Sequence, residues 1–252
     1  PYKNRPGYDF LVQAMGGLMS ITGLPDGVEG AGPQKVGVAL TDIMTGLYAT
    51  IGILAALAER DRSGLGQFVD LALLDVTAAT LANQASNYLV GGMEPTRLGN
   101  AHPNIVPYQS FVAADGHLIV AVGNDAQFRR FAETLGCPQL ADDARFATNQ
   151  ARVKHREALI PLLQRPMLDR TKDQWLATLE AAQVPAGPIN SIAEVFAEPQ
   201  IQARGMQVEL AHPHNPNLQV VGNPIKLSRT PVVYDRPPPT LGEHTDAVLS
   251  KL

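Results

Sequence analysis

The chain has 252 residues, a formal net charge of −4 and scattered Lys and Arg, so it can bury a sizeable core and shows no basic surface for nucleic acid. Its single cysteine, Cys137, excludes an intrachain disulfide and favours a reducing, cytoplasmic setting. The longest apolar run is interrupted by Gly46 and Thr50 and closed by charges, which predicts no membrane-spanning segment. The N-terminus has neither an initiator Met nor an apolar targeting core and reads like the middle of a longer chain.

The region before residue 92 is predicted to be mostly helical. A short helix over residues 8–15 runs into a glycine pair, and a loop rich in Gly and Pro follows over 23–37. Beyond the long helix described next, residues 67–73 are predicted to form a strand. A further helix over residues 74–91 is predicted to have Asp75 as its N-cap.

The long helix contains the residue that organises the chain, Asp42. Thr41 or Asp42 is the predicted N-cap, the apolar run 43–57 predicts a buried helix, and Gly64 is predicted to end it. A carboxylate at that start feels the free N–H groups and the positive end of the helix, which favour its ionised form. Such a carboxylate can act as a nucleophile in covalent catalysis, although most Asp residues at helix starts are only caps.

Residues 92–107 lack periodicity and read as a linker, and residues 183–190 read as a second one around Val184-Pro185-Ala186-Gly187-Pro188. The elements predicted after the first linker are a hairpin over 108–122, helices over 125–135, 149–163 and 171–182, a short helix over 192–196, strands over 206–210 and 218–221, and a final helix opened by residues 242–245.

A set of short motifs keeps one order across essentially the whole chain. They are Arg5-Pro6-Gly7-Tyr8-Asp9-Phe10, the Asp42 loop and helix, Ser63-Gly64-Leu65-Gly66-Gln67-Phe68-Val69-Asp70 followed by Asp75, Gly99-Asn100-Ala101-His102-Pro103 with Pro107-Tyr108, Ala114-Asp115-Gly116, the Val184 to Pro188 run, Pro199-Gln200 through Ala203-Arg204-Gly205-Met206, and Leu241-Gly242-Glu243-His244-Thr245. Together these motifs resemble the class III CoA-transferase family, also called the CaiB/BaiF family.

The resemblance implies an α/β fold in which a discontinuous, Rossmann-like large domain is combined with a small α+β domain. Two subunits of such enzymes form a homodimer of interlocked rings. Family members begin with a further Rossmann-like segment that supplies many CoA contacts, and this chain resembles the part after that segment. The implied division is 1–91 as a large-domain part with the nucleophile helix, 92–107 as a linker, 108–182 as the small domain, and 183–252 as a linker and return to the large domain.

The resemblance also implies a chemistry for Asp42. Its carboxylate would attack the thioester of an acyl-CoA to give a mixed anhydride and free CoA thiolate, and the thiolate would return to give an aspartyl-CoA thioester. The acceptor carboxylate then repeats the sequence in reverse. The implied partners are therefore an acyl-CoA and a small carboxylic acid, with coenzyme A as a substrate and no permanently bound cofactor. Tyr8 and Asp9 correspond to a family pair that lines the CoA pocket, although Tyr8 reads equally well as a packed aromatic residue.

Other polar residues give weaker indications of a functional role. His212 and His214 have no third ligand nearby in the sequence, so no metal site is assigned. His102 reads as a structural histidine and Cys137 as inert. Some transferases carry a run of glycines after the second hairpin strand that covers the active site, whereas this chain offers only Gly123, so that lid is expected to be shortened or replaced.

Three functions remain open on the sequence. The first is CoA transfer between small carboxylic acids, and no residue decides which acids. The second is racemisation of 2-methylacyl-CoA esters, for which related enzymes carry a histidine at the position of Tyr8 because two acid/base groups are needed. The third is a non-catalytic interaction module, which the intact Asp42 stretch disfavours.

Overall fold

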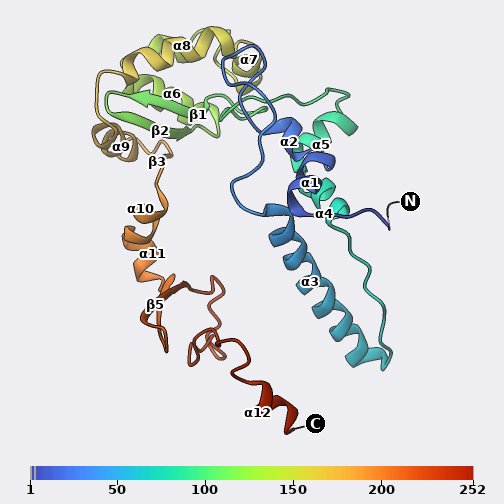
Figure 1. The fold of residues 1–252 in the computed structure, drawn as a ribbon. Helices are drawn as coiled ribbons and strands as arrows, with labels where there is room; N and C mark the ends of the chain where they lie inside the picture. The colour runs from blue at the N-terminus through green and yellow to red at the C-terminus, as the bar shows by residue number, and fades with distance from the viewer. Residues whose placement is uncertain (1, 3, 252) are drawn as a thin grey trace. The chain divides into compact units, whose positions relative to one another are not determined.

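The computed structural model describes residue 2 and residues 4–251, and it divides the chain into two compact units, Pro1–Gly187 and Pro188–Leu252. The first unit contains a helical region and a small α+β region, and the second contains short helices and a hairpin (Figure 1). The four-part domain division implied by the resemblance stays a prediction, because the first unit includes both the helical region and the α+β region.

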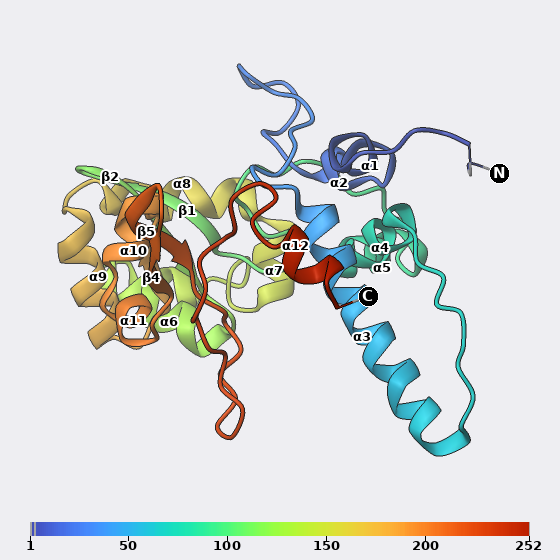
Figure 2. The ribbon, with the colours of Figure 1, turned by 60° about the horizontal axis from the view of Figure 1, so that its bottom comes forward.

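The helical region is built around the long helix α3. Its elements are α1 (Asp9–Met15), α2 (Leu18–Ile21), α3 (Leu40–Ser63), α4 (Leu73–Thr80) and α5 (Ala82–Leu89). The helix α1 contacts α2, α3 and α4, and α3 also contacts α4, so the start of α3 lies in a small cluster of helices (Figure 2). Gly16 permits this packing, because a Cβ there would lie 2.4 Å from the Thr77 side chain.

The two ends of α3 are stabilised in different ways. Gly64 has a φ of 75° and ends the helix, as predicted. The predicted N-cap is wrong, because Ala39 is the N-cap and both Thr41 and Asp42 lie inside the first turn. The capping acceptor comes instead from another helix: the Asp9 carboxylate Oδ1 accepts a hydrogen bond of 2.8 Å from the Thr41 N–H.

The helix α3 continues through the residues expected to interrupt it. The hydroxyl of Thr50 donates to the carbonyl of Gly46, four residues earlier, and so is satisfied inside the helix. At 24 residues, α3 is long and apolar enough to cross a membrane, contrary to the prediction that no segment reaches this length. Helices that another part of a soluble protein covers also reach this length and composition.

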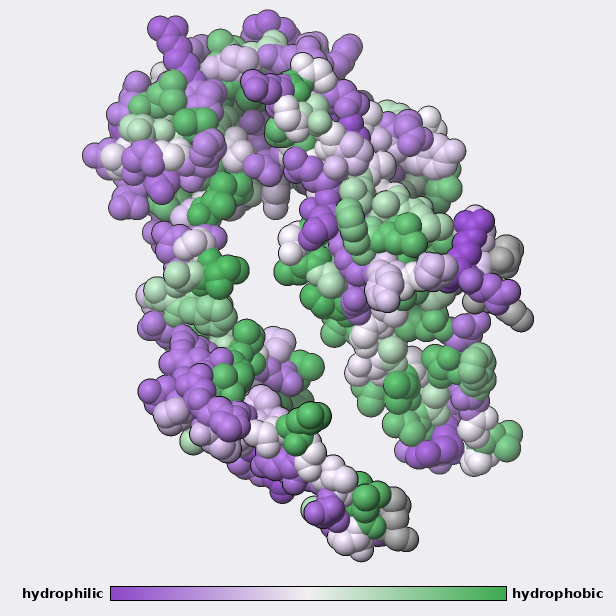
Figure 3. Space-filling view, in the orientation of Figure 1, coloured by the Kyte–Doolittle hydropathy of each residue, from purple (hydrophilic) through white to green (hydrophobic). Residues whose placement is uncertain are grey.

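The burial predicted for α3 is not found in this chain. Thr41 is its only buried residue, and hydrophobic side chains lie exposed along it (Figure 3). The large exposed side chains are Ile43, Leu47, Tyr48, Ile51, Ile53, Leu54 and Leu57. An apolar surface of this extent is typical of a face that another segment or subunit covers.

Two predictions for the region after α3 are wrong. Residues 67–72 form no strand and lie exposed, because a strand needs a hydrogen-bonded neighbour and none of the described segments pairs with them. The helix predicted over 74–91 is split into α4 and α5 next to Ala82, which has a φ of 49°. Asp75 lies in the first turn of α4, whose N-cap is Ala72.

The small α+β region holds the main hydrophobic core. Its sheet has the order β1-β2-β3, with β1 (Tyr108–Ala113) and β2 (Gly116–Ala121) paired antiparallel from Tyr108↔Ala121 to Ala113↔Gly116. The predicted hairpin is therefore confirmed. Alternate residues of both strands face the core, where Phe111 packs edge-on against Phe131. The helices of this region are α6 (Asp125–Thr134), α7 (Asn149–Lys154), α8 (Arg156–Met167) and α9 (Lys172–Ala181), with a 3₁₀ turn at Pro138–Ala141.

The helix predictions in this region hold with one exception. Thr171 is the N-cap of α9 and forms a capping box with Gln174. The helix predicted over 149–163 is divided at His155 into α7 and α8. The short strand β3 (Ala186–Pro188) lies inside the predicted second linker and joins β2, a pairing that three residues with a proline do not signal.

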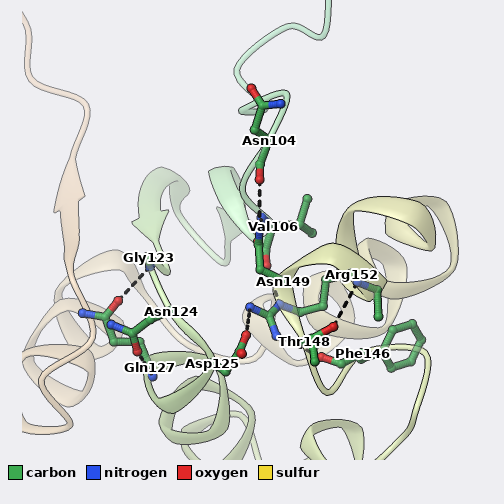
Figure 4. Close-up of polar contacts among 11 residues, drawn as sticks. Asn104, Val106, Gly123, Asn124, Asp125, Gln127, Phe146, Thr148, Asn149 and Arg152 are labelled. Carbon is green, nitrogen blue, oxygen red and sulfur yellow. Dashed lines mark hydrogen bonds and ion pairs between the residues drawn. The ribbon is translucent and has the colours of Figure 1, made fainter. Parts of the chain in front are cut away.

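A buried arginine joins α7 to the first linker. Arg152 is fully buried and donates to the carbonyls of Val106 (2.6 Å) and Phe146 (3.0 Å) and to the carboxylate of Asp125 (2.8 Å) (Figure 4). Burial lowers the pKa of Arg152, opposed by the hydrogen bond and charge of Asp125, and the group stays charged at neutral pH. Its contacts satisfy backbone carbonyls that no helix or strand pairs.

Replacing this arginine is expected to destabilise the small region. Arg152→Met leaves the two carbonyls without their donor, which is expected to lower the free energy of unfolding by about 3 kcal/mol. The measurement is urea denaturation at low protein concentration, followed by fluorescence of Trp175, which lies buried in the same core. Arg129→Met is the matched control, because Arg129 pairs with Asp142 at an exposed site, and it should leave the midpoint unchanged. Equal midpoints for both variants would contradict the assignment.

The second unit contains α10 (Ile192–Ala197), α11 (Pro199–Ala203), the hairpin of β4 (Gln207–His212) and β5 (Asn215–Val221), and α12 (Thr245–Leu249). The predicted short helix, both strands and the closing helix are confirmed, and α11 was not predicted. Ser191 and Glu194 form a capping box at the start of α10. The hairpin alternates exposed and half-buried residues, which is typical of a sheet with one solvated face.

Candidate active site

Asp42 lies in the first turn of α3 with its side chain exposed. No hydrogen bond or ion pair joins its carboxylate to any residue in the described part of the chain. Within the first turn, the N–H of Leu40 donates to Val38 (2.8 Å) and that of Ile43 to Ala39 (3.1 Å). The N–H of Asp42 has no acceptor among the described residues. The site therefore offers a free carboxylate beside a free backbone donor at the positive end of a helix.

Asp9 lies against the start of the same helix. Its half-buried carboxylate accepts from the Thr41 N–H through Oδ1 (2.8 Å) and from the Gln13 side chain through Oδ2 (2.7 Å). The structure thus brings Asp9 next to the backbone of the residue that precedes Asp42. The predicted contact of Asp9 with CoA stays a prediction.

Tyr8 immediately precedes α1 and is 81% exposed. Its reading as a packed aromatic residue therefore does not hold in this chain. Its carbonyl accepts the Val12 N–H at 3.0 Å, which fixes the backbone at the start of α1. A large exposed ring beside Asp9 is available to a ligand or to another segment.

Two buried polar residues of the site were not predicted. Gln13 is fully buried and Thr77 nearly so, and the Thr77 hydroxyl lies 3.3 Å from the hydroxyl of Thr41. The signal for Gln13 was present: a lone amide in the apolar stretch of α1, four residues after Asp9, where helix side chains meet. Thr77 gives no comparable signal, because its partner is distant in the sequence.

The loop after β2 is short and tightly held. Residues 122–124 alone join β2 to α6, and Asn124 caps α6 by accepting the Gln127 N–H (2.9 Å). The Gln127 side chain in turn accepts the Gly123 N–H at 2.7 Å (Figure 4). These contacts fix the one glycine of this loop, Gly123, and the shortening or replacement of the lid stays a prediction.

The remaining candidates behave as structural residues. His102 accepts the Asn104 N–H on Nδ1 (3.0 Å) and packs on the Tyr108 ring, and burial, then the Arg156 charge, lower its pKa, so it is neutral at pH 7. Burial raises the pKa of the Cys137 thiol, which keeps it protonated. In residues 2 and 4–251, no three His, Cys, Asp or Glu side chains cluster as metal ligands.

The sequence and the fold together identify the family of proteins to which this chain belongs. The sequence matches CoA-transferase family III over residues 1–245, so the chain belongs to this family, and the resemblance drawn from its motifs is confirmed. The described mixed α/β structure has the family's fold: a solved CAIB/BAIF family protein from Brucella suis matches it with a TM-score of 0.81 and 48% identity, covering 100% of this chain and 64% of that one.

Two curated relatives are similar to this chain over its whole length. The chain is 52% identical over its whole length to a succinate–glutarate CoA-transferase from Agrobacterium fabrum, of which it covers 62%. It is 40% identical to a human succinyl-CoA:glutarate CoA-transferase, of which it covers 57%. The chain therefore spans about 60% of the length of these curated relatives.

Proposed function

We propose that the protein containing this chain transfers CoA between small dicarboxylic acids, with succinyl-CoA as donor and glutarate as acceptor, through covalent intermediates on Asp42. The observation that carries this proposal is the 52% identity to a succinate–glutarate CoA-transferase over the whole chain. Coenzyme A is a substrate in this scheme, and no resident cofactor is required.

The reaction proceeds through two kinds of Asp42 intermediate. A carboxylate oxygen of Asp42 bonds to the thioester carbonyl carbon, the C–S bond breaks, and CoA leaves as a thiolate. The thiolate then attacks the Asp42 acyl carbon of the mixed anhydride, which forms the aspartyl-CoA thioester and releases succinate. Glutarate attacks this thioester and expels the thiolate, which takes the glutaryl group from the new anhydride and frees the Asp42 carboxylate.

Several features of Asp42 support this role. Its carboxylate is exposed and unpaired within the described chain, so substrate need not displace a partner. The positive end of α3 favours the ionised carboxylate that attacks the thioester. The free N–H of Asp42 is a donor of the kind that stabilises a developing oxyanion, provided that it reaches the tetrahedral carbon.

The phosphates of CoA and the exclusion of water require groups beyond these residues. The Gly/Pro-rich loop before α3 contains one cation, Lys35, whose side chain donates to the Val36 carbonyl. We infer that the rest of the phosphate site, and the surface that shields the anhydride from water, come from an upstream segment and from a second subunit. A homodimer of interlocked rings is part of the same proposal.

The two alternatives have less support. A racemase needs a second acid/base group opposite Asp42, and Tyr8 stands where related racemases carry a histidine. A non-catalytic module would not require an unpaired carboxylate at the start of α3. Neither alternative is favoured by a contact in the described chain.

The test is a transfer assay on the full-length protein with succinyl-CoA and a panel of acids. Glutarate is expected to give glutaryl-CoA faster than a monocarboxylic acid of equal length, such as pentanoate, because the second carboxylate distinguishes the relatives' substrates. A parallel incubation of a 2-methylacyl-CoA in deuterated water is expected to place no deuterium on the α-carbon. Deuterium incorporation at enzymatic rates without acyl transfer would establish the racemase instead.

A further inference from the structure

Every polar group of the buried Gln13 side chain forms a hydrogen bond. Its Nε2 donates to the Asp9 carboxylate (2.7 Å) and more weakly to the Val38 carbonyl (3.4 Å), and its Oε1 accepts the Val36 N–H (3.0 Å). The residue has no exposed surface. A buried amide with all its groups paired restricts the segments that it joins, because breaking any contact leaves a polar group unsatisfied.

These contacts connect three segments around the start of α3. Gln13 belongs to α1, and Val36 and Val38 belong to the loop that leads into α3. Through Asp9, Gln13 also reaches the first turn of α3, since the other carboxylate oxygen of Asp9 accepts the Thr41 N–H. The donor on Gln13 therefore fixes the rotation of the Asp9 carboxyl group, and the carboxyl group fixes the backbone next to Asp42.

Thr41 is held from its other side as well. Its side chain is buried, and its hydroxyl lies 3.3 Å from that of Thr77 on α4. The absence of a side chain at Gly16 lets α1 pack closely against α4 at Thr77. The residue that precedes Asp42 is thus fixed through both its backbone and its side chain, while Asp42 itself stays free to react.

We propose that Gln13 is a positioning residue for Asp42: through Asp9 it orients the first turn of α3 so that the carboxylate meets the thioester in one geometry. This inference rests on the proposed role of Asp42 as nucleophile. Misplacing a reacting group by about 1 Å can lower a rate by about a hundredfold, so a small shift of this turn has a measurable effect.

The test compares Gln13→Met with a matched control in the full-length protein. The control is Gln164→Met, because the Gln164 side chain makes the same kind of bridge, accepting from the Val112 N–H (3.0 Å) and donating to the Val112 carbonyl (2.8 Å), within the α+β region. Gln13→Met is expected to lower kcat by about ten- to a hundredfold with little change in KM for the acyl-CoA. Gln164→Met should keep kcat. A KM effect alone, or equal kcat losses in both variants, would overturn the proposal.

If the Gln13→Met protein does not fold, a second pair of variants tests the same contact. Gln13→Glu keeps an acceptor for the Val36 N–H but sets two carboxylates against each other. Adding Asp9→Asn restores a donor and an acceptor at this contact with their roles reversed. Asp9→Asn is therefore expected to lower kcat in the wild-type background and to raise it in the Gln13→Glu background. A further loss in the double variant would contradict the proposed contact.

Hydrogen exchange separates this inference from the proposed function. The amide of Thr41 donates a hydrogen bond to Asp9, so exchange in a peptide over residues 39–43 should become at least about tenfold faster in Gln13→Met and stay unchanged in Gln164→Met. Unchanged exchange would overturn the positioning role even if Asp42 is the nucleophile. If exchange becomes faster in Gln13→Met but Asp42 of the wild-type protein never forms an adduct, the contact through Asp9 is supported and the proposed chemistry is refuted.

Discussion

Asp42→Ala is expected to abolish CoA transfer, lowering kcat by at least about a thousandfold, because it removes the proposed nucleophile, the one acidic residue in the first turn of α3. The fold should persist, since the Asp42 carboxylate has no hydrogen bond or ion pair within the described chain and the cap of α3 is supplied by Asp9. Activity is measured with saturating succinyl-CoA and glutarate on the full-length protein, and folding is measured by circular dichroism and thermal melting.

The control for this variant is Asp173→Ala. Asp173 is likewise exposed in the first turn of a helix, α9, in the α+β region, and its loss should leave kcat unchanged. Incubating the wild-type protein with acyl-CoA and hydroxylamine should convert Asp42 to a hydroxamate, detected by peptide mass. Retained transfer in Asp42→Ala, or a hydroxamate on a different residue, would show that Asp42 is not the nucleophile.

The 252-residue chain alone is expected to bind CoA poorly and to self-associate. Most of α3 is apolar and exposed, with Ile51 exposed over 64% of its surface, and soluble proteins seldom leave such a face uncovered. Calorimetric titration of CoA, with light scattering for size, compares the chain with the full-length protein. The full-length protein should bind CoA at micromolar concentration and scatter as a defined oligomer.

A charge on α3 provides a control for the self-association. Ile51→Lys should reduce the scattering of the isolated chain more than Thr50→Lys, which adds the same charge next to it but removes no large apolar side chain. In the full-length protein, Ile51→Lys should instead impair folding, because a covered lysine is desolvated. Micromolar CoA binding by a monomeric 252-residue chain would show that the pocket is complete within it.

The elements that the sequence predicts correctly are those fixed by nearby residues. The helix over 171–182, the turn between β1 and β2 and the Gly64 helix end each depend on residues a few positions apart. The strand over 67–73 fails because its pairing needs a neighbour that no described segment supplies. The N-cap of α3 fails because the acceptor comes from Asp9, on another helix.

The residues of the candidate site also divide into those that nearby sequence indicates and those that depend on distant contacts. Asp42 could be selected because its motif resembles a family, and local rules alone identify it only as a carboxylate at a helix start. The sequence marks Gln13 as a lone amide four residues after Asp9, but its full role depends on burial and on contacts with Val36 and Val38, more than twenty residues away. The pairing of Thr41 with Thr77 depends equally on how α3 and α4 pack.

The cap that Asp9 places on α3 also has a consequence for the order of folding. The contact joins residues 32 positions apart, so the first turn of α3 gains its acceptor only after the intervening loop has closed. The rest of α3 can form earlier from local hydrogen bonds. During refolding, helical circular dichroism should therefore recover before the protein can form an adduct on Asp42, and the delay should report the docking of α1.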